Sequence, residues 1–255
     1  MRGLAALTWL EIHSRRRRIL ALLAFSALYL VAAIAFRALA TGEHGQVEPD
    51  ALFSVGGYAL VSTMLLSGWT IGRFPLVIAL VLLHGIFSSD VTAGYTRVYA
   101  STRVRLLTLY GFRLLLLLAL AFLMSAVLLP AFDAIMLGKL SGSGIFVLIA
   151  AYLLVFGSLT VFFSVFTRAD AWCTIFVFLG ALVWHAMLRG GLLADAPVAL
   201  TQAVTMILPP QGALNAIEDA FGMAAPIPWS AFLYVCAYSA LLLVIAGVQL
   251  TRREI

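Results

Sequence analysis

The sequence predicts an all-α membrane protein, a single transmembrane domain over residues 1–255 with six membrane-spanning helices. Hydrophobic residues make up 64% of the chain and charged residues only 11%, whereas soluble domains contain about 25% charged residues. Several apolar runs also approach the ~20 residues that cross a hydrocarbon core of about 30 Å. Only short polar segments separate these runs, so we expect one helical bundle with no soluble domain.

The first span is predicted over residues 19–39, directly after four arginines, Arg15 to Arg18. No small-residue cleavage site follows this apolar run, so we expect an uncleaved span rather than a signal peptide. Before the arginines, residues 4–13 intersperse aliphatic residues and a tryptophan with polar ones, a pattern typical of a short helix in the membrane interface. A disordered leader is the alternative for these residues.

The apolar run over residues 51–87 is too long for one crossing, because a continuous helix there would extend about 55 Å at 1.5 Å per residue. Glycines and Pro75 offer places to break it. We expect one crossing over residues 71–89, preceded by an outer interfacial or re-entrant segment over residues 52–68. Two crossings would place the basic residues of 97–113 on the side opposite the four arginines, against the positive-inside rule.

The remaining four spans are predicted over residues 106–129, 145–166, 171–188 and 229–250. We expect Pro130 to end the first of them, because proline interrupts a helix. Residues 194–228 are too polar and rich in proline to cross, and are predicted to form an outer re-entrant segment before the last span. Two short helices within it, about 198–207 and 212–221, are expected at the outer interface or dipping into the bundle.

The charge distribution orients this topology with both termini in the cytoplasm, in the cytoplasmic (inner) membrane. Twelve of the 16 basic residues then face inward. They are Arg2, Arg15 to Arg18, Arg97, Arg103, Arg105, Arg113, Arg168, Arg252 and Arg253. Since these residues flank apolar runs rather than forming a separate basic face, we expect no nucleic-acid partner.

Residues that carry chemistry are scarce. The chain contains no GxxxxGK[ST], HExxH or GxSxG motif, which argues against hydrolysis of a nucleotide, a peptide or an ester. The predicted spans contain no Asp or Glu, and apart from Arg37, Arg73 and Arg113 their basic groups are His84 and His185, which argues against ion-coupled transport and an intramembrane enzyme. Cys173 and Cys236 are expected to be small buried residues. We therefore expect no enzyme activity, no metal site and no cofactor in this chain itself.

One polar, basic segment interrupts the apolar middle of the chain, residues 90–105, DVTAGYTRVYASTRVR. Between two spans it must lie on a membrane surface, where it can touch a soluble partner. An interfacial helix before a basic cluster, six spans, this D-x-x-x-G start and a terminal Arg-Arg-Glu together resemble the permease subunit of ABC exporters of the ABC-2 type. The resemblance extends over nearly the whole chain and depends mainly on the order of its elements.

The resemblance implies that residues 90–105 form a coupling helix seated on an ATP-binding subunit. The implied contacts are Asp90, Gly94, Tyr95, Arg97, Tyr99, Ser101, Thr102, Arg103 and Arg105. Arg103 stands where the family has a proline, and Arg105 only approximates the usual arginine. A smaller second contact is implied at the turn between the fourth and fifth spans, through Arg168 and Asp170.

The implied activity is ATP-driven export, with ATP and magnesium bound by two copies of the partner subunit. A second permease copy would complete the pathway, by default as a homodimer, with a heterodimer as the alternative. Spans one, two and five would line the pathway, and their aromatic residues suit an amphipathic, drug-like or lipid-like substrate. These residues are Phe25, Tyr29, Phe36, Phe176, Phe178 and Trp184. Contact with lipid or neighbouring helices is the alternative for them, and a non-transporting membrane anchor that recruits a cytoplasmic partner is the alternative function.

Overall fold

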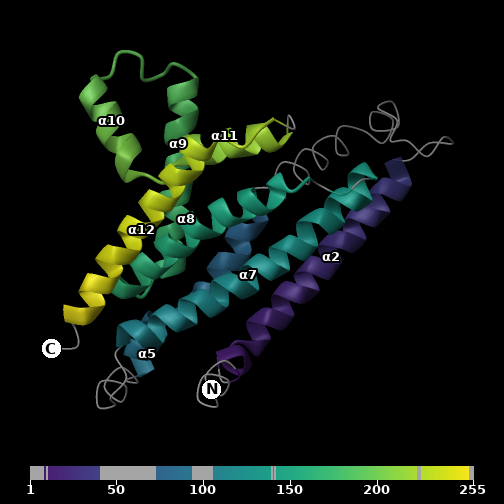
Figure 1. The fold of residues 1–255 in the computed structure, drawn as a ribbon, viewed down its shortest axis with the longest axis horizontal. Coiled ribbons are helices and arrows are strands. Elements are labelled where there is room, and N and C mark those ends of the chain that lie inside the picture. Colours follow the sequence, from purple (N-terminus) through teal and green to yellow (C-terminus); the bar gives the residue numbers. More distant parts are fainter. Residues whose placement is uncertain are drawn as a thin grey trace.

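The computed structural model describes residues 9, 11–40, 73–93, 106–138, 140, 142–222 and 225–252, and every regular element in these ranges is a helix (Figure 1). Six helices are long and apolar enough to cross a membrane. The prediction of an all-α, multi-pass membrane protein is therefore confirmed. The long helices are α2 (Arg16–Ala40), the segment Arg73–Thr92, α7 (Leu106–Leu137), α8 (Gly144–Phe166), α9 (Asp170–Arg189) and α12 (Trp229–Arg252).

The segment Arg73–Thr92 is not one continuous helix. Residues 73–83 are helical, residues 84–87 form a turn, and α5 (Ser88–Ala93) follows. At the N-terminus, residues 11–14 are helical and continue through a turn at Arg15 into α2. Trp9 is also described, whereas residues 4–8 and 10 of the predicted interfacial helix, the predicted outer segment 52–68 and residues 94–105 lie outside the described residues.

The helices alternate in direction, so that two ends of the bundle can be distinguished (Figure 1). The start of α2, the α5 helix, the turn between α8 and α9, and the end of α12 lie at one end. We call this the basic end, because Arg15 to Arg18 lie there. The short helices α10 (Val198–Ile207) and α11 (Gln211–Gly222) lie at the opposite end.

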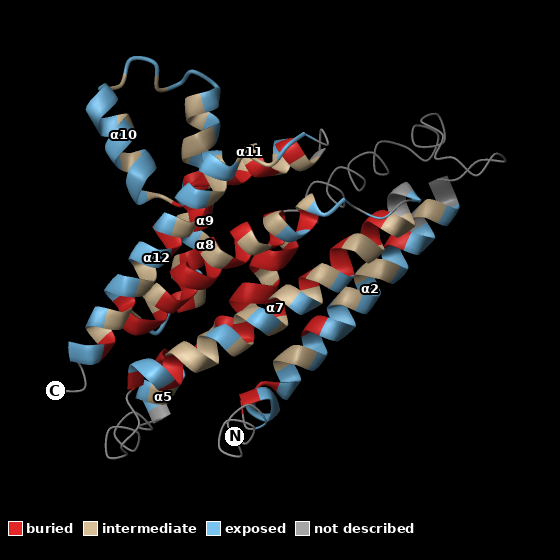
Figure 2. Cartoon of the chain, viewed as in Figure 1, coloured by how far each residue is buried: buried red, intermediate tan, exposed pale blue. Residues whose placement is uncertain are grey.

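The core of the bundle is built around α8, which is the helix most completely covered by its neighbours (Figure 2). It packs against α7, α9, α11 and α12, and its Leu148, Ile149 and Phe156 have no exposed surface. The side chain of Leu118 in α7 lies close to Gly157, since a Cβ at position 157 would lie 2.8 Å from Leu118 Cδ2 and would displace that side chain. Outward-facing side chains of α2, α9 and α12 are largely apolar, as expected for helices that meet lipid.

The sequence predicted that Pro130 ends the third span, and this prediction is wrong. The helix α7 continues through this proline to Leu137, and Asp133 lies in this last part of the helix and is buried. A proline inside a helix removes one backbone hydrogen bond, and neighbouring groups in a helical bundle compensate for that loss. Arg37 of α2 contributes near this end of α7 by donating to the carbonyl oxygens of Ala134 and Ile135.

The two short helices predicted in residues 194–228 are confirmed as α10 and α11, with nearly the predicted bounds. They differ in their surroundings. The helix α11 packs on α8, α9 and α12 and buries Leu214, Ile217 and Ala220, whereas α10 buries none of its residues. Thus α11 forms part of the bundle, and α10 lies beside it.

Candidate functional site

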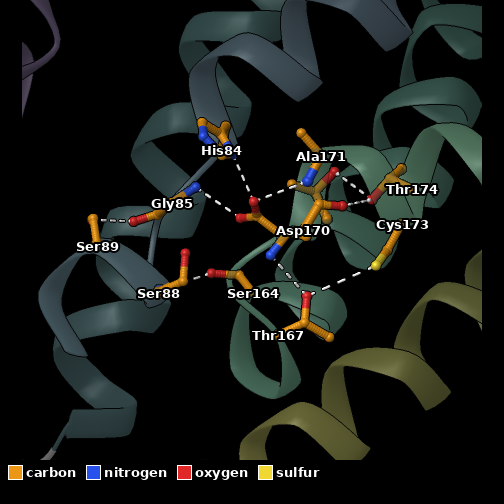
Figure 3. A network of polar contacts seen from close by, with 12 residues as sticks. His84, Gly85, Ser88, Ser89, Ser164, Thr167, Asp170, Ala171, Cys173 and Thr174 are labelled. Carbon is orange, nitrogen blue, oxygen red and sulfur yellow. Dashed lines mark hydrogen bonds and ion pairs between the residues drawn. The ribbon is translucent and has the colours of Figure 1, made fainter. Parts of the chain in front are cut away.

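The best candidate for a functional site is the junction at the basic end, which we define as residues 84–93 with the α8–α9 turn, residues 166–170. The turn over residues 84–87 contains Gly85, whose φ of +71° lies in the left-handed region that favours glycine. It redirects the chain from the helix over residues 73–83 into α5. Side chains from α8 and α9 (Figure 3), together with arginines of the N-terminal basic cluster, then satisfy the backbone groups that this turn leaves without helical partners.

Ser164 of α8 and Asp170 of α9 hold the turn from one side (Figure 3). The Ser164 hydroxyl oxygen accepts hydrogen bonds from the backbone N–H groups of Phe87, at 3.0 Å, and Ser88, at 3.1 Å. Asp170 is fully buried. Its carboxylate accepts from the Gly85 N–H at 2.8 Å and from His84 Nδ1 at 2.6 Å. These contacts fasten the start of α5 to the α8–α9 turn.

Two arginines of the N-terminal basic cluster hold the turn from the other side. Arg15 Nη1 donates to the carbonyl oxygens of Leu82 and His84, the latter at 3.2 Å. Arg18 Nη1 donates to the carbonyl oxygens of His84 and Val81. Carbonyl groups at the end of a helix lack intrahelical partners and carry partial negative charge, so arginine stabilises them in two ways.

An ionic chain connects α5 to α7, to the N-terminal helical segment and to α2. Asp90 of α5 accepts a hydrogen bond from Tyr110 at 2.9 Å and forms an ion pair with Arg113, both in α7. Arg113 Nε lies 3.0 Å from Glu11 Oε2, and Glu11 Oε1 lies 2.7 Å from Arg15 Nε. All four charged side chains are at most 14% exposed. Loss of one member of such a chain leaves a buried charge unpaired, which costs about 3–5 kcal/mol.

A cavity of about 170 Å³ opens between α5 and the α8–α9 turn. Its lining is mostly polar and consists of Ser88, Val91, Ser164, Val165, Phe166, Thr167 and Arg168. Val91 and Phe166 are exposed apolar residues at this surface, and Arg168 is exposed beside them. The junction thus presents two apolar side chains, a cation and a recess, a combination suited to contact with another protein.

A second, larger cavity of about 410 Å³ lies beside the junction, between α2, the helix over residues 73–83 and α9. We call it the lateral groove. Its walls are Val77, Leu80, Val81, Ala171 and Ile175, and Arg18 and His84 complete the lining. These residues belong to spans one, two and five.

The structure places the predicted coupling-helix residues only in part. Asp90 lies in α5, but its carboxylate is engaged by α7, so it positions the helix rather than remaining free for a partner. The other predicted contacts in this segment, Gly94, Tyr95, Arg97, Tyr99, Ser101, Thr102, Arg103 and Arg105, lie outside the described residues. At the second predicted contact Arg168 is exposed. Asp170 is buried, and its carboxylate is bonded to His84 and to the Gly85 N–H.

The predicted pathway aromatics whose side chains the structure describes do not all gather in one place. Phe25 and Tyr29 pack on Phe74, with ring centroids 5.7 and 5.3 Å apart. Phe178 is buried against Phe156 of α8, Phe176 is exposed on α9, and the Trp184 indole donates to Thr205 of α10. The side chain of Phe36 lies outside the described residues. Spans one, two and five do share a space, but its walls are the aliphatic residues of the lateral groove.

The sequence did not predict that Ser164 and Glu11 take part in the contacts around the junction. Ser164 lies in an otherwise apolar span, and Glu11 is an acidic residue four positions before Arg15, a spacing that favours an ion pair on a helix. Within the described residues no three His, Cys, Asp or Glu side chains gather into a metal-binding group. Comparisons with protein-family models, with curated proteins and with solved structures found no match.

Proposed function

We propose that this chain is the membrane-spanning subunit of an ATP-driven exporter of the ABC-2 type, which works with a separate ATP-binding subunit. Two copies of each subunit would form the transporter, in the cytoplasmic membrane with the basic end toward the cytoplasm, as the positive-inside rule favours. ATP and magnesium would bind to the partner. The chain itself would carry the pathway for an amphipathic substrate.

The observation that carries this proposal is the rigid attachment of α5 to the bundle. Ser164, Asp170, Arg18 and Arg113 connect α5 and its preceding turn to α8, α9, α2 and α7. A force applied to α5 at the basic end would therefore reach four long helices at once. Rigid-body transitions of this kind require an element that moves with the helices rather than independently of them.

The lateral groove adds support, because a transporter needs a space that an amphiphile can occupy. With a volume of about 410 Å³ and aliphatic walls, the groove falls in the range of ligand-binding cavities, about 300–1,000 Å³. It also lies beside the junction, since His84 borders the groove and binds Asp170. Movement of the junction would therefore change the shape of the groove.

A non-transporting membrane anchor is the second candidate. The exposed Val91, Phe166 and Arg168 around the polar cavity would serve equally to recruit a cytoplasmic protein of another kind. The two functions predict different partners and different consequences of ATP, so that one purification can separate them.

The test begins with the full chain purified from its native membranes in mild detergent. The exporter predicts a co-purifying protein that hydrolyses ATP, at one copy per chain, and ATP-dependent removal of a fluorescent amphiphile from reconstituted vesicles. We expect the double substitution Val91→Glu and Phe166→Glu to reduce recovery of this protein at least tenfold, because it adds two negative charges to the apolar contact.

The control is Gln202→Glu, an exposed position on α10 at the opposite end, which should leave recovery unchanged. Recovery of a partner without ATPase activity would favour the anchor. Full recovery of the ATPase by the Val91→Glu, Phe166→Glu variant would contradict the proposed docking surface.

A further inference from the structure

The lateral groove has two chemically different parts. Val77, Leu80, Val81, Ala171 and Ile175 form an aliphatic wall, and the end near the junction carries Arg18 and His84. In a membrane, an aliphatic groove on the side of a helical bundle is filled by hydrocarbon, because lipid chains are its solvent. What distinguishes this groove is the fixed cation at one end of it.

Arg18 is half-buried and only partly satisfied by the protein. Its Nη1 donates to the carbonyl oxygens of Val81 and His84, which holds the guanidinium at the end of the groove. Among the described residues, its Nε and Nη2 have no hydrogen-bond acceptor. A guanidinium with donors to spare matches the geometry of a phosphate, which it can bind through two parallel hydrogen bonds.

The charge balance around Arg18 favours an anion. The two nearby carboxylates already have partners, since Asp170 binds His84 and the Gly85 N–H, and Glu11 binds Arg15 and Arg113. Arg16 and Arg17, the residues just before Arg18, are not fully buried and add positive charge. A cluster of arginines at the edge of a membrane-spanning helix attracts anionic headgroups, by about 1 kcal/mol for each residue near the surface.

We infer that the lateral groove binds an anionic phospholipid from the leaflet at the basic end. Its phosphate lies on the Arg18 guanidinium, and one acyl chain lies along Val77, Val81 and Ile175. This site needs neither the ATP-binding partner nor transport. Because the lipid sits between α2, the helix over residues 73–83 and α9, its occupancy ties those three helices together.

The experiment measures lipid binding by native mass spectrometry on the delipidated full chain in detergent. The probes are phosphatidylglycerol and phosphatidylcholine with identical acyl chains. We expect phosphatidylglycerol to bind about tenfold more tightly, a difference of about 1.4 kcal/mol, because both lipids offer a phosphate to Arg18 but only phosphatidylcholine also carries a cation, which the arginines repel. Arg18→Gln should weaken binding of both lipids and reduce this preference, whereas Arg18→Lys should keep part of both.

Two further variants make the result specific. Arg17→Gln removes a neighbouring charge that does not line the groove and should weaken phosphatidylglycerol binding less than Arg18→Gln does. Ile175→Trp fills the groove and should weaken binding of both lipids, with helix content and melting temperature as the check on folding. Equal affinity for the two lipids, unchanged selectivity in Arg18→Gln, or equal losses in Arg17→Gln and Arg18→Gln would each overturn the inference. If Arg18→Gln does not fold, undiminished lipid binding by Ile175→Trp would overturn it instead. No ATP-binding subunit is present, so the outcome is independent of the proposed export function.

Discussion

Gly85 illustrates how a single backbone angle shapes the basic end. Its φ of +71° directs the chain away from the helix over residues 73–83, and its N–H is thereby presented to Asp170. In residues other than glycine this conformation costs about 1–2 kcal/mol, because the Cβ approaches the following carbonyl oxygen. The backbone conformation favours glycine at this position. Packing does not, because a Cβ there would meet no atom closer than 3.4 Å.

Gly85→Ala should therefore lower the melting temperature of the detergent-solubilised chain, with a destabilisation of about 1–2 kcal/mol. Gly111→Ala is a matched control. Gly111 lies inside α7, and a Cβ at this position would have nothing within 4 Å, so alanine there should be neutral or stabilising. Equal melting temperatures for Gly85→Ala and the unmodified chain would show that the turn is not under this constraint.

The short helix α11 contributes to the opposite end of the bundle in a way that depends on pH. Its Glu218 accepts a hydrogen bond from Tyr152 of α8 at 3.2 Å. Burial raises the pKa of the Glu218 carboxyl above its ordinary value of about 4.5, and this effect outweighs the opposing influence of Tyr152 and Arg73. The folded protein thus holds a proton on this group more tightly than the unfolded chain does.

It follows that stability from this group is greatest below pH of about 4.5 and is lost as the pH rises through the raised pKa. Glu218→Gln should flatten this part of the pH dependence and raise the melting temperature at neutral pH. Asp219→Asn, at the exposed neighbouring position, should reduce the slope only slightly, because Asp219 exerts the smallest of the influences on Glu218. Melting curves at a series of pH values from about 4 upward check both, since the loss of stability begins as the pH passes the ordinary pKa. A slope in Glu218→Gln as steep as in the unmodified chain would contradict the assignment.

The bundle as a unit is connected at its basic end by the chain of charges from Asp90 through Arg113 and Glu11 to Arg15. Arg113 is central, since it pairs with both carboxylates. These contacts join α5 and α7 to the N-terminal segment and α2. The proposed transmission of force from a partner to the spans depends on this connection.

Replacing Arg113 by Gln should leave Asp90 and Glu11 without their shared partner, at a cost of about 3–5 kcal/mol. We expect hydrogen–deuterium exchange in residues 88–93 to increase, because α5 then separates more readily from α7. Exchange in α10, at the opposite end, serves as the internal reference. Unaltered protection of residues 88–93 would mean that Ser164 and the turn alone hold α5.

Much of the architecture was accessible from the sequence, because crossing a membrane is a local requirement. A run of about 20 apolar residues meets it irrespective of its neighbours. All six crossings, the α8–α9 turn and the bounds of α10 and α11 were predicted in this way. Pro130 was misjudged because proline has a strong local effect, while its tolerance in α7 depends on the surrounding bundle.

The candidate site was accessible only in outline. Alternation of the spans predicted that Asp90 and the α8–α9 turn lie at one end, but not that Asp170 would be buried or that the predicted aromatics would be dispersed. Hydropathy indicates that a helix crosses the membrane, but it does not indicate which face of that helix meets which neighbour. Phe178 was thus expected in a pathway and is packed against Phe156.

By itself the sequence determined that this chain is a six-span helical membrane protein with a strongly basic end, since those properties depend on composition and on the order of segments along the chain. Only the tertiary structure decided how Arg18, Ser164 and Asp170 meet the turn after residue 83, and that a groove with one cation opens beside it. These contacts join residues 66 to 86 positions apart. They exist because helix packing brings otherwise unpaired carbonyl and N–H groups within reach of side chains that a low-dielectric interior requires to be paired.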